Sequence, residues 1–132
     1  MQARLLNVCD YPTLVEWWKA NRFTPPARDM LPESGTGGIM VSNSSGRDIC
    51  SGFLFLTNSK VAWMEYIVAD KEYKEADRPN AIIFLIEALK EIAKEQGFKY
   101  IFTVVNNPHL IKKYEQCGFL TGSNSQEMII SI

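Results

Sequence analysis

The sequence predicts an α/β (α+β) fold, because short β-rich runs and helical patterns alternate along its 132 residues. Turn residues between β-branched and aromatic runs predict a meander of antiparallel strands in the middle of the chain. An amphipathic helical pattern follows this meander, and a further β-rich run follows the helix. The predicted order is β-α-β-β-β-α-β-α-β, and the length fits a single domain over residues 1–132.

Each predicted element has a local cause. Apolar residues at helical spacing follow Asp10 and Thr13, either of which can cap a helix that reaches Ala20. Prolines and glycines exclude regular structure from Thr24 to Gly38, and a loop of this length can line a substrate site. Later helices are marked by a proline near the start and a glycine after the end. The strands expected are Arg4–Val8, Gly38–Ser42, Ile49–Thr57, Val61–Ala69, Tyr100–Val105 and Glu127–Ile132, and the later helices are Pro79–Gln96 and Pro108–Cys117.

Composition excludes several classes of function. A net charge of −1, with scattered basic residues, gives no electrostatic footprint for nucleic acid. Cys9, Cys50 and Cys117 lack CxxC spacing and His109 has no neighbouring ligand set, so neither a disulfide framework nor a metal site is indicated. No apolar stretch reaches membrane-span length. We expect a cytoplasmic protein with no nucleic-acid or membrane partner.

The segment Asn107–Phe119, which follows the apolar run Tyr100–Val105, carries the best clue to function. Its order of asparagine, short helix and Tyr-Glu-x-x-Gly-Phe resembles the C-terminal signature of the GNAT acetyltransferase superfamily. The resemblance implies an acyl-CoA N-acyltransferase-like fold with a central mixed, mostly antiparallel sheet flanked by helices. It also implies direct acetyl transfer from acetyl-CoA to an amine of a small molecule or peptide. Tyr114 would then face the sulfur of coenzyme A and act as the acid.

The same resemblance suggests where the cofactor arm would lie. Ile67, Val68 and Ala69 correspond to the strand end that offers backbone groups to pantetheine, a contact that needs strand-like geometry more than particular side chains. Asn107 lies at the family's asparagine position, where its amide can hold the cofactor arm. An asparagine directly before a helix-starting proline is also a strong N-cap, and the two roles are compatible.

The expected pyrophosphate loop departs from the family pattern. Residues 71–81 contain no glycine, carry a proline that removes one amide donor, and include carboxylates that would repel a diphosphate. Arg78, Asn80 and Ala81 are the residues that could still hold phosphate. The carboxylates can instead cap the following helix and offset its dipole. A catalytically inactive GNAT-fold binding or interaction protein that has lost coenzyme A binding is therefore the alternative to an enzyme.

Glu65 is the candidate general base, because it lies within an otherwise apolar strand where burial would raise its pKa. If it lies on the solvent face of the sheet, it is only the polar residue of a strand, with Met64 and Tyr66 on the other face. Tyr114 has a similar alternative, with its ring in the core and its hydroxyl at the surface.

A partner surface is the third hypothesis. At least one of the adjacent residues Trp17 and Trp18 is expected to face away from the helical stripe, where it could line an acceptor pocket or a protein surface. The equally ordinary alternative is one tryptophan in the core and one half-buried at the surface. This surface or a free sheet edge could support a homodimer.

Overall fold

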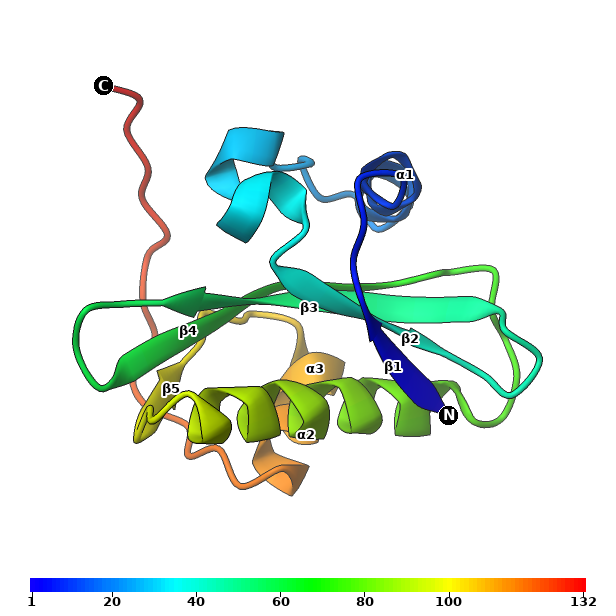
Figure 1. The fold of residues 1–132 in the computed structure, drawn as a ribbon. Helices are drawn as coiled ribbons and strands as arrows, with labels where there is room; N and C mark the ends of the chain where they lie inside the picture. Colours follow the sequence, from blue (N-terminus) through cyan, green and yellow to red (C-terminus); the bar gives the residue numbers. More distant parts are fainter.

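Five strands form one mixed sheet in the computed structural model, which describes residues 1–132 (Figure 1). The elements are β1 (Gln2–Leu5), α1 (Tyr11–Ala20), the 3₁₀ helices η1 (Arg28–Met30) and η2 (Pro32–Gly35), β2 (Gly38–Ser42), β3 (Asp48–Leu56), β4 (Val61–Ala69), α2 (Arg78–Glu95), β5 (Tyr100–Phe102) and α3 (Pro108–Gln116). The predicted α+β class is confirmed, and the meander strands β2 to β4 and helices α2 and α3 lie within one residue of their predicted bounds.

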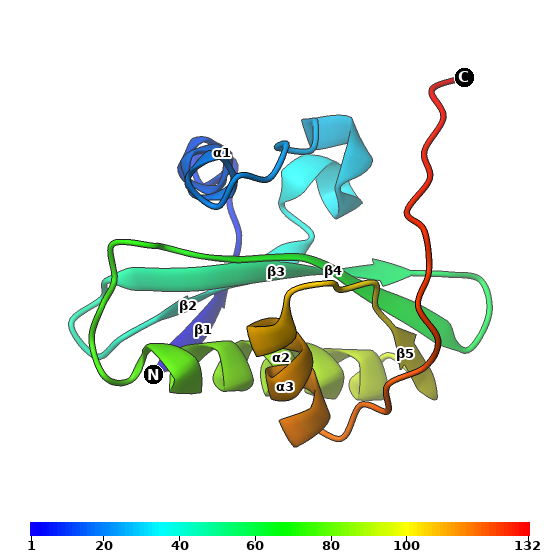
Figure 2. The ribbon, with the colours of Figure 1, turned by 180° about the vertical axis from the view of Figure 1, so that it is seen from behind.

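The strand order follows the chain order, β1-β2-β3-β4-β5. Neighbours from β1 to β4 are antiparallel, whereas β4 and β5 are parallel over the three pairs from Val61–Tyr100 to Trp63–Phe102. The parallel pair requires a crossover, which α2 supplies. Helices α2 and α3 lie on one face of the sheet, and α1 with the two 3₁₀ helices lies on the other (Figures 1 and 2).

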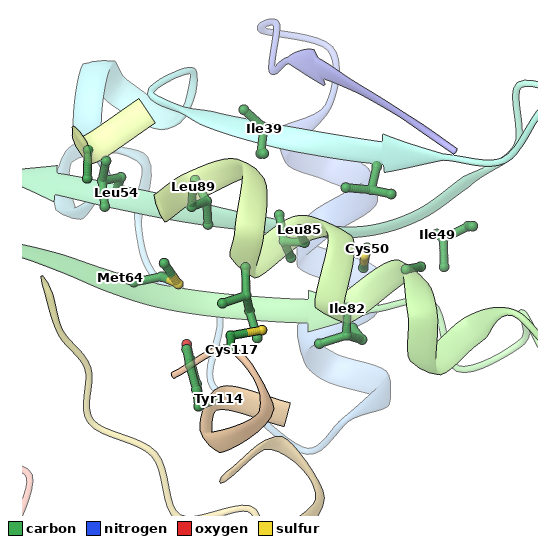
Figure 3. Packing of buried hydrophobic residues seen from close by; sticks show 14 of the residues in the cluster. Ile39, Ile49, Cys50, Leu54, Met64, Ile82, Leu85, Leu89, Tyr114 and Cys117 are labelled. Carbon is green, nitrogen blue, oxygen red and sulfur yellow. The ribbon is translucent and has the colours of Figure 1, made fainter. Parts of the chain in front are cut away.

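The larger core lies between the sheet and the face of α2. Leu85 and Leu89 of α2 are buried against Leu54 of β3 and Met64 of β4, and Tyr114 reaches the same cluster from α3 (Figure 3). The helical spacing of Leu85 and Leu89 places both on one apolar stripe of α2, which covers the sheet. None of the helices is both long enough and apolar enough to cross a membrane.

The smaller core lies under α1, and it corrects the expectation of an exposed tryptophan. Trp17 and Trp18 are only 8% and 2% exposed. Adjacent helical residues point about 100° apart, so an apolar face of that width can bury both when it lies flat on a sheet. Trp18 stacks on Phe53 of β3 with ring centroids 6.4 Å apart. The two tryptophans therefore offer no surface to a partner or an acceptor.

A β-bulge in β4 changes the direction of this strand. Glu65 pairs with Phe53 and Val68 pairs with Ser51, so Tyr66 and Ile67 together face the single residue Gly52. Tyr66 adopts a positive φ of 58°, which is unusual for a bulky residue. Glycine is needed opposite the bulge, because a Cβ at Gly52 would lie 2.9 Å from Cγ1 of Ile67.

The predicted C-terminal strand Glu127–Ile132 is wrong. No regular structure follows α3, and the chain passes the edge of the sheet toward the side that carries α1 (Figures 1 and 2). The β-branched residues there satisfy the local preference for a strand, yet a strand also needs a hydrogen-bonded neighbour, which this segment lacks. The strand expected to reach Val105 also ends early, at Phe102, and the first strand is Gln2–Leu5 instead of Arg4–Val8.

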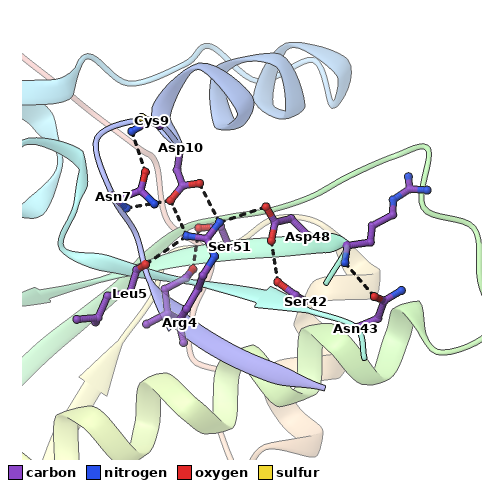
Figure 4. Close-up of polar contacts among 11 residues, drawn as sticks. Arg4, Leu5, Asn7, Cys9, Asp10, Ser42, Asn43, Asp48 and Ser51 are labelled. Carbon is purple, nitrogen blue, oxygen red and sulfur yellow. Dashed lines mark hydrogen bonds and ion pairs between the residues drawn. The ribbon is translucent and has the colours of Figure 1, made fainter. Parts of the chain in front are cut away.

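An ion pair joins β1 to the start of α1. Two guanidinium nitrogens of Arg4 donate to the carboxylate of Asp10 at 2.8 and 2.9 Å, and the Asn7 amide donates to the same carboxylate at 2.9 Å (Figure 4). Asp10 is the N-cap residue but makes no side-chain capping bond to the helix, because Arg4 and Asn7 use its oxygens. The hydrogen bond from Arg4 holds the pKa of Asp10 below its ordinary value.

We predict that Asp10→Asn lowers the free energy of unfolding by about 1–2 kcal/mol at neutral pH, a figure reduced because Arg4 is 40% exposed. A depressed carboxyl pKa stabilises the fold above its ordinary pKa and loses that effect as the pH falls. The deficit should therefore shrink toward acid pH in urea titrations. Asp29→Asn, at an exposed carboxylate of η1, is the control and should change little. An equal deficit at acid and neutral pH would contradict the ion pair.

Candidate functional site

The candidate site lies where β4 and β5 separate. Their backbone ladder ends at the pair Trp63 and Phe102. Two residues further along, Glu65 makes the next connection with its side chain, because its carboxylate accepts the Val104 amide at 2.7 Å. Beyond this point β4 continues to Ala69 without a strand on that edge. The two parallel strands therefore separate here, with a carboxylate where the separation begins, and we call this region the β4–β5 opening.

Glu65 lies half-buried on the face of the sheet that carries α1, the face of its cross-strand partner Phe53. Burial raises the pKa of Glu65 to about 7, the hydrogen bond from the Val104 amide opposes this rise, and the charge of Glu127 adds to it. Strict alternation of side chains fails here. Met64 faces the α2 core, while the bulge turns Tyr66 to the same side as Glu65, against Trp18. Glu65 is thus neither fully solvated nor deeply buried, and it exchanges its proton near neutral pH.

Tyr114 approaches the opening from the opposite side of the sheet. It is only 3% exposed and belongs to the core under α2, and its hydroxyl lies at the border of the opening beside Thr103. Its ring lies 4.8 Å from that of Phe119, which folds back after α3. Burial, and to a smaller degree the charge of Glu65, raise the pKa of Tyr114 above its ordinary value. The phenol is therefore protonated at neutral pH.

Thr103 connects the two candidates, and sequence reasoning missed it. Its hydroxyl donates to the hydroxyl of Tyr114 at 3.3 Å, while the next amide in the chain, that of Val104, binds Glu65. Since Thr103 is the donor, the phenolic hydrogen of Tyr114 stays free to donate elsewhere. The sequence does contain a signal for Thr103, since it is the polar residue within the apolar run Tyr100–Val105.

The three backbone positions expected to hold pantetheine lie past the bulge. Val68 is buried in the core under α1, and Ile67 packs toward the core under α2. The carbonyl of Ala69 accepts from the side chain of Asn21, at 3.1 Å, and Asn21 also caps α1 by donating to the Trp17 carbonyl. One expected pantetheine contact is thus occupied by the end of α1, which no local sequence signal indicated.

The loop between β4 and α2 is organised by side chains instead of glycine amides. Tyr73 is buried, and its hydroxyl donates to Asp77 at 2.7 Å. Asp77 is the N-cap residue of α2 without a side-chain capping bond. Its carboxylate therefore anchors the loop, which differs from the expected capping role. The side chain of Arg78 turns back onto the Asp70 carbonyl at 3.4 Å.

Two amides at the start of α2 were expected to meet phosphate, and they differ in availability. The Ala81 amide donates to the Asp77 carbonyl at 3.0 Å within the helix. The Asn80 amide has no backbone acceptor, and Asn80 is exposed. Pro79 contributes no donor. The start of α2 therefore presents one free amide, that of Asn80, while the Arg78 guanidinium is turned onto the Asp70 carbonyl.

The start of α3 matches the capping alternative for Asn107. Its side-chain oxygen accepts from the amides of His109 and Leu110 at 2.9 and 3.2 Å. Its side-chain nitrogen remains available, because the residue is exposed. His109 is also exposed, as expected for a solvated histidine. Cys117 is buried, and burial raises the pKa of its thiol to about 11, which fits an inert cysteine.

The segment expected to be irregular from Thr24 to Gly38 contains η1 and η2. Glu33 and Ser34 both have positive φ values, which mark a tight turn inside η2. Together with the end of β3, the two 3₁₀ helices line a hollow of about 450 Å³ that includes Asp29, Met30 and Phe55. This hollow lies on the same face of the sheet as Glu65.

Solved structures share this fold at low sequence identity. An acetyltransferase from Trypanosoma brucei has a TM-score of 0.67 and 20% identity, over 98% of this chain and 99% of its own. Glucosamine-6-phosphate N-acetyltransferase from Arabidopsis thaliana has a TM-score of 0.67 and 15% identity, over 98% of both chains. N-acetylglutamate synthase from Neisseria gonorrhoeae, in complex with coenzyme A and L-arginine, has a TM-score of 0.74 and 12% identity, over 92% of this chain and 28% of its own.

These likenesses show the fold, which is that of the GNAT acetyltransferases, as the sequence motif predicted. Neither a protein-family model nor a curated protein matches the sequence.

We predict that Glu65→Gln raises the free energy of unfolding at pH 8 by about 1 kcal/mol, after allowance for partial exposure. A carboxyl with a raised pKa costs stability as the pH rises through the interval between its ordinary and raised values, here 4.5 to about 7. The glutamine can still accept the Val104 amide. Thermal unfolding should show the gain at pH 8 and almost none at pH 4. A gain of equal size at both values would contradict a raised pKa.

Proposed function

We propose that this protein is an N-acetyltransferase that moves the acetyl group of acetyl-CoA directly to an amine. The observation that carries the proposal is the meeting of Glu65 and Tyr114 at the β4–β5 opening, from opposite sides of the sheet. Glu65 is half-buried with a pKa of about 7, and Tyr114 is buried and protonated. A base and an acid thus approach residues 103 and 104 from opposite faces of the sheet, which suits an acceptor on one face and a thioester on the other.

Residues of this chain would hold acetyl-CoA along the free edge of β4. Backbone groups of Ile67, Val68 and Ala69 can pair with the amides of an extended pantetheine arm once Asn21 releases the Ala69 carbonyl. The Asn107 side-chain nitrogen lies at the other border of the opening. Arg78 and the free Asn80 amide are the groups for phosphate. Acetyl-CoA supplies the activated acetyl group as a thioester.

In the proposed reaction one N–C bond forms and one C–S bond breaks, and Glu65 and Tyr114 carry out the proton transfers. Glu65, in its ionised form, removes a proton from the ammonium group of the acceptor, directly or through a water molecule. The amine lone pair forms the new N–C bond, and the C–S bond electrons leave with sulfur. Tyr114 donates its free phenolic hydrogen to this sulfur. The nitrogen loses two protons overall. Glu65 passes the first to solvent, and the second, lost as the amide forms, replaces the proton that Tyr114 gave to sulfur, so both side chains are restored.

The loop before α2 supports a second candidate function, that of a GNAT-fold binding protein without coenzyme A. Its carboxylates Glu75 and Asp77 stand at the start of α2, and Arg78 is turned onto the Asp70 carbonyl. Such a protein would not release coenzyme A from acetyl-CoA with any amine. Acetyl transfer is preferred, because a binding protein gives no reason for Glu65 and Tyr114 to converge.

Thiol release from acetyl-CoA, measured with small-molecule and peptide amines, tests the proposal. We predict that kcat/KM rises with pH through about 7, as Glu65 loses its proton. Tyr114→Phe should lower kcat roughly 10²-fold with little change in KM, because it removes a proton donor and not a binding contact. His109→Gln, on the exposed side of the same helix, should match the wild type.

Two results would overturn the proposal. One is the absence of thiol release with every class of amine. The other is full activity of Tyr114→Phe, which would show that Tyr114 is not the proton donor.

A further inference from the structure

An aromatic surface lies beside Glu65, on the face of the sheet that carries α1. We define the aromatic surface as Phe23, Phe55 and Tyr66, all of which are partly exposed. Tyr66 is central, because its ring centroid lies 6.1 Å from that of Phe23 and 6.1 Å from that of Phe55. Tyr66 follows Glu65 directly in β4, and the bulge turns both side chains to this face. The candidate base is therefore bordered by aromatic rings.

The aromatic surface continues into the hollow of about 450 Å³ between the 3₁₀ helices and the end of β3. Phe55 belongs to both, since its ring packs on Tyr66 and also lines the hollow. Along β3, Phe55 lies two residues from Phe53, the cross-strand partner of Glu65, and residues two apart share a face about 7 Å from each other. One small molecule can thus reach both Glu65 and the hollow, whose volume is typical of small-molecule pockets.

The hollow carries uncompensated negative charge. Asp29 and Glu33 line it, and its lining contains no lysine or arginine. Neither carboxylate forms an ion pair. The one basic residue of the two 3₁₀ helices, Arg28, lies over the ring of Tyr11 in α1, with its guanidinium 4.4 Å from the ring centroid. The two carboxylates are therefore available to a cation that enters the hollow.

Two further carboxylates lie near the aromatic surface. Glu65 and Glu127 form no ion pair either. Burial, and then the charge of Glu127, raise the pKa of Tyr66, and the same two causes act on Glu65. This charge attracts cations and repels acceptors that carry phosphate or carboxylate groups. Aromatic rings attract cations as well. The region therefore favours a positively charged, partly apolar molecule without acidic groups.

We propose that the acceptor is an aliphatic diamine, which presents one amine to Glu65 and its second ammonium group to Asp29 and Glu33 in the hollow. The alkyl chain between the two nitrogens lies along Phe55 and Tyr66. This inference rests on the proposed acetyl transfer and names the class of its acceptor. The bond changes are those of that reaction, at one of the two nitrogens.

The same arrangement predicts a single acetylation. The first transfer converts one ammonium group into a neutral amide. For a second transfer the molecule would have to turn around, and the neutral amide would then lie at Asp29 and Glu33 in place of an ammonium group. Mass spectrometry of the reaction mixture should therefore show the monoacetyl product accumulating. A second transfer as fast as the first would overturn the assignment of the hollow.

Calorimetric titrations with diaminopentane and pentylamine, with and without coenzyme A, test the proposal. These probes differ only in the second amine, and we expect the diamine to bind roughly tenfold more tightly. The double variant Asp29→Asn and Glu33→Gln should remove this preference and leave the affinity for pentylamine unchanged. The matched control is Glu91→Gln with Glu95→Gln, which removes two exposed carboxylates from α2 on the other face of the sheet and should keep the preference.

Binding and thiol release together separate this inference from the proposed acetyl transfer. Equal binding of the two probes, or a preference that survives the double variant, would overturn the diamine assignment. Thiol release with the same kcat/KM for both probes, or with a lysine peptide alone, would overturn it too while leaving acetyl transfer intact. Selective binding of diaminopentane with no thiol release from acetyl-CoA would overturn the acceptor role and acetyl transfer together.

Discussion

The separation of β4 from β5 after Trp63 is the constraint on which the candidate site depends. The bulge at Tyr66 and Ile67, made possible by the missing side chain of Gly52, turns β4 away at this point. Without the bulge the parallel ladder could continue, and Glu65 would be an ordinary strand residue. With it, one strand keeps free backbone groups while its neighbour leads directly into α3 and Tyr114.

Glu65 gives this opening a carboxyl group with a raised pKa. Burial without a cationic partner would leave a carboxylate unstable, and the hydrogen bond from the Val104 amide compensates in part. The result is a pKa of about 7, between that of a solvated carboxylate and that of a deeply buried one. The same interaction closes the end of the ladder. One contact therefore both fixes the geometry of the opening and sets the proton affinity of the candidate base.

Much of the fold could be predicted from sequence because its causes are local. Turn residues delimit β2 to β4, and Asn107 before Pro108 fixes the start of α3. Polarity within a strand suggested Glu65 and a motif suggested Tyr114, and the structure places both beside Thr103, but their roles stay predictions. The role of Thr103 and the contact of Asn21 with Ala69 could not be predicted, since they depend on which distant segments meet. The expected strand Glu127–Ile132 failed because strand formation requires a partner that local preference does not reveal.

The most direct test of this account is the response of assigned backbone amide resonances to acetyl-CoA in the folded protein. The account predicts saturable shifts that cluster at Ile67–Ala69, at residues 78–80 and along residues 103–107, the two borders of the opening. Loss of the Asn21 contact should accompany them. Shifts confined to other parts of the molecule, or none at millimolar acetyl-CoA, would contradict the claim that the separation of β4 from β5 forms a cofactor site.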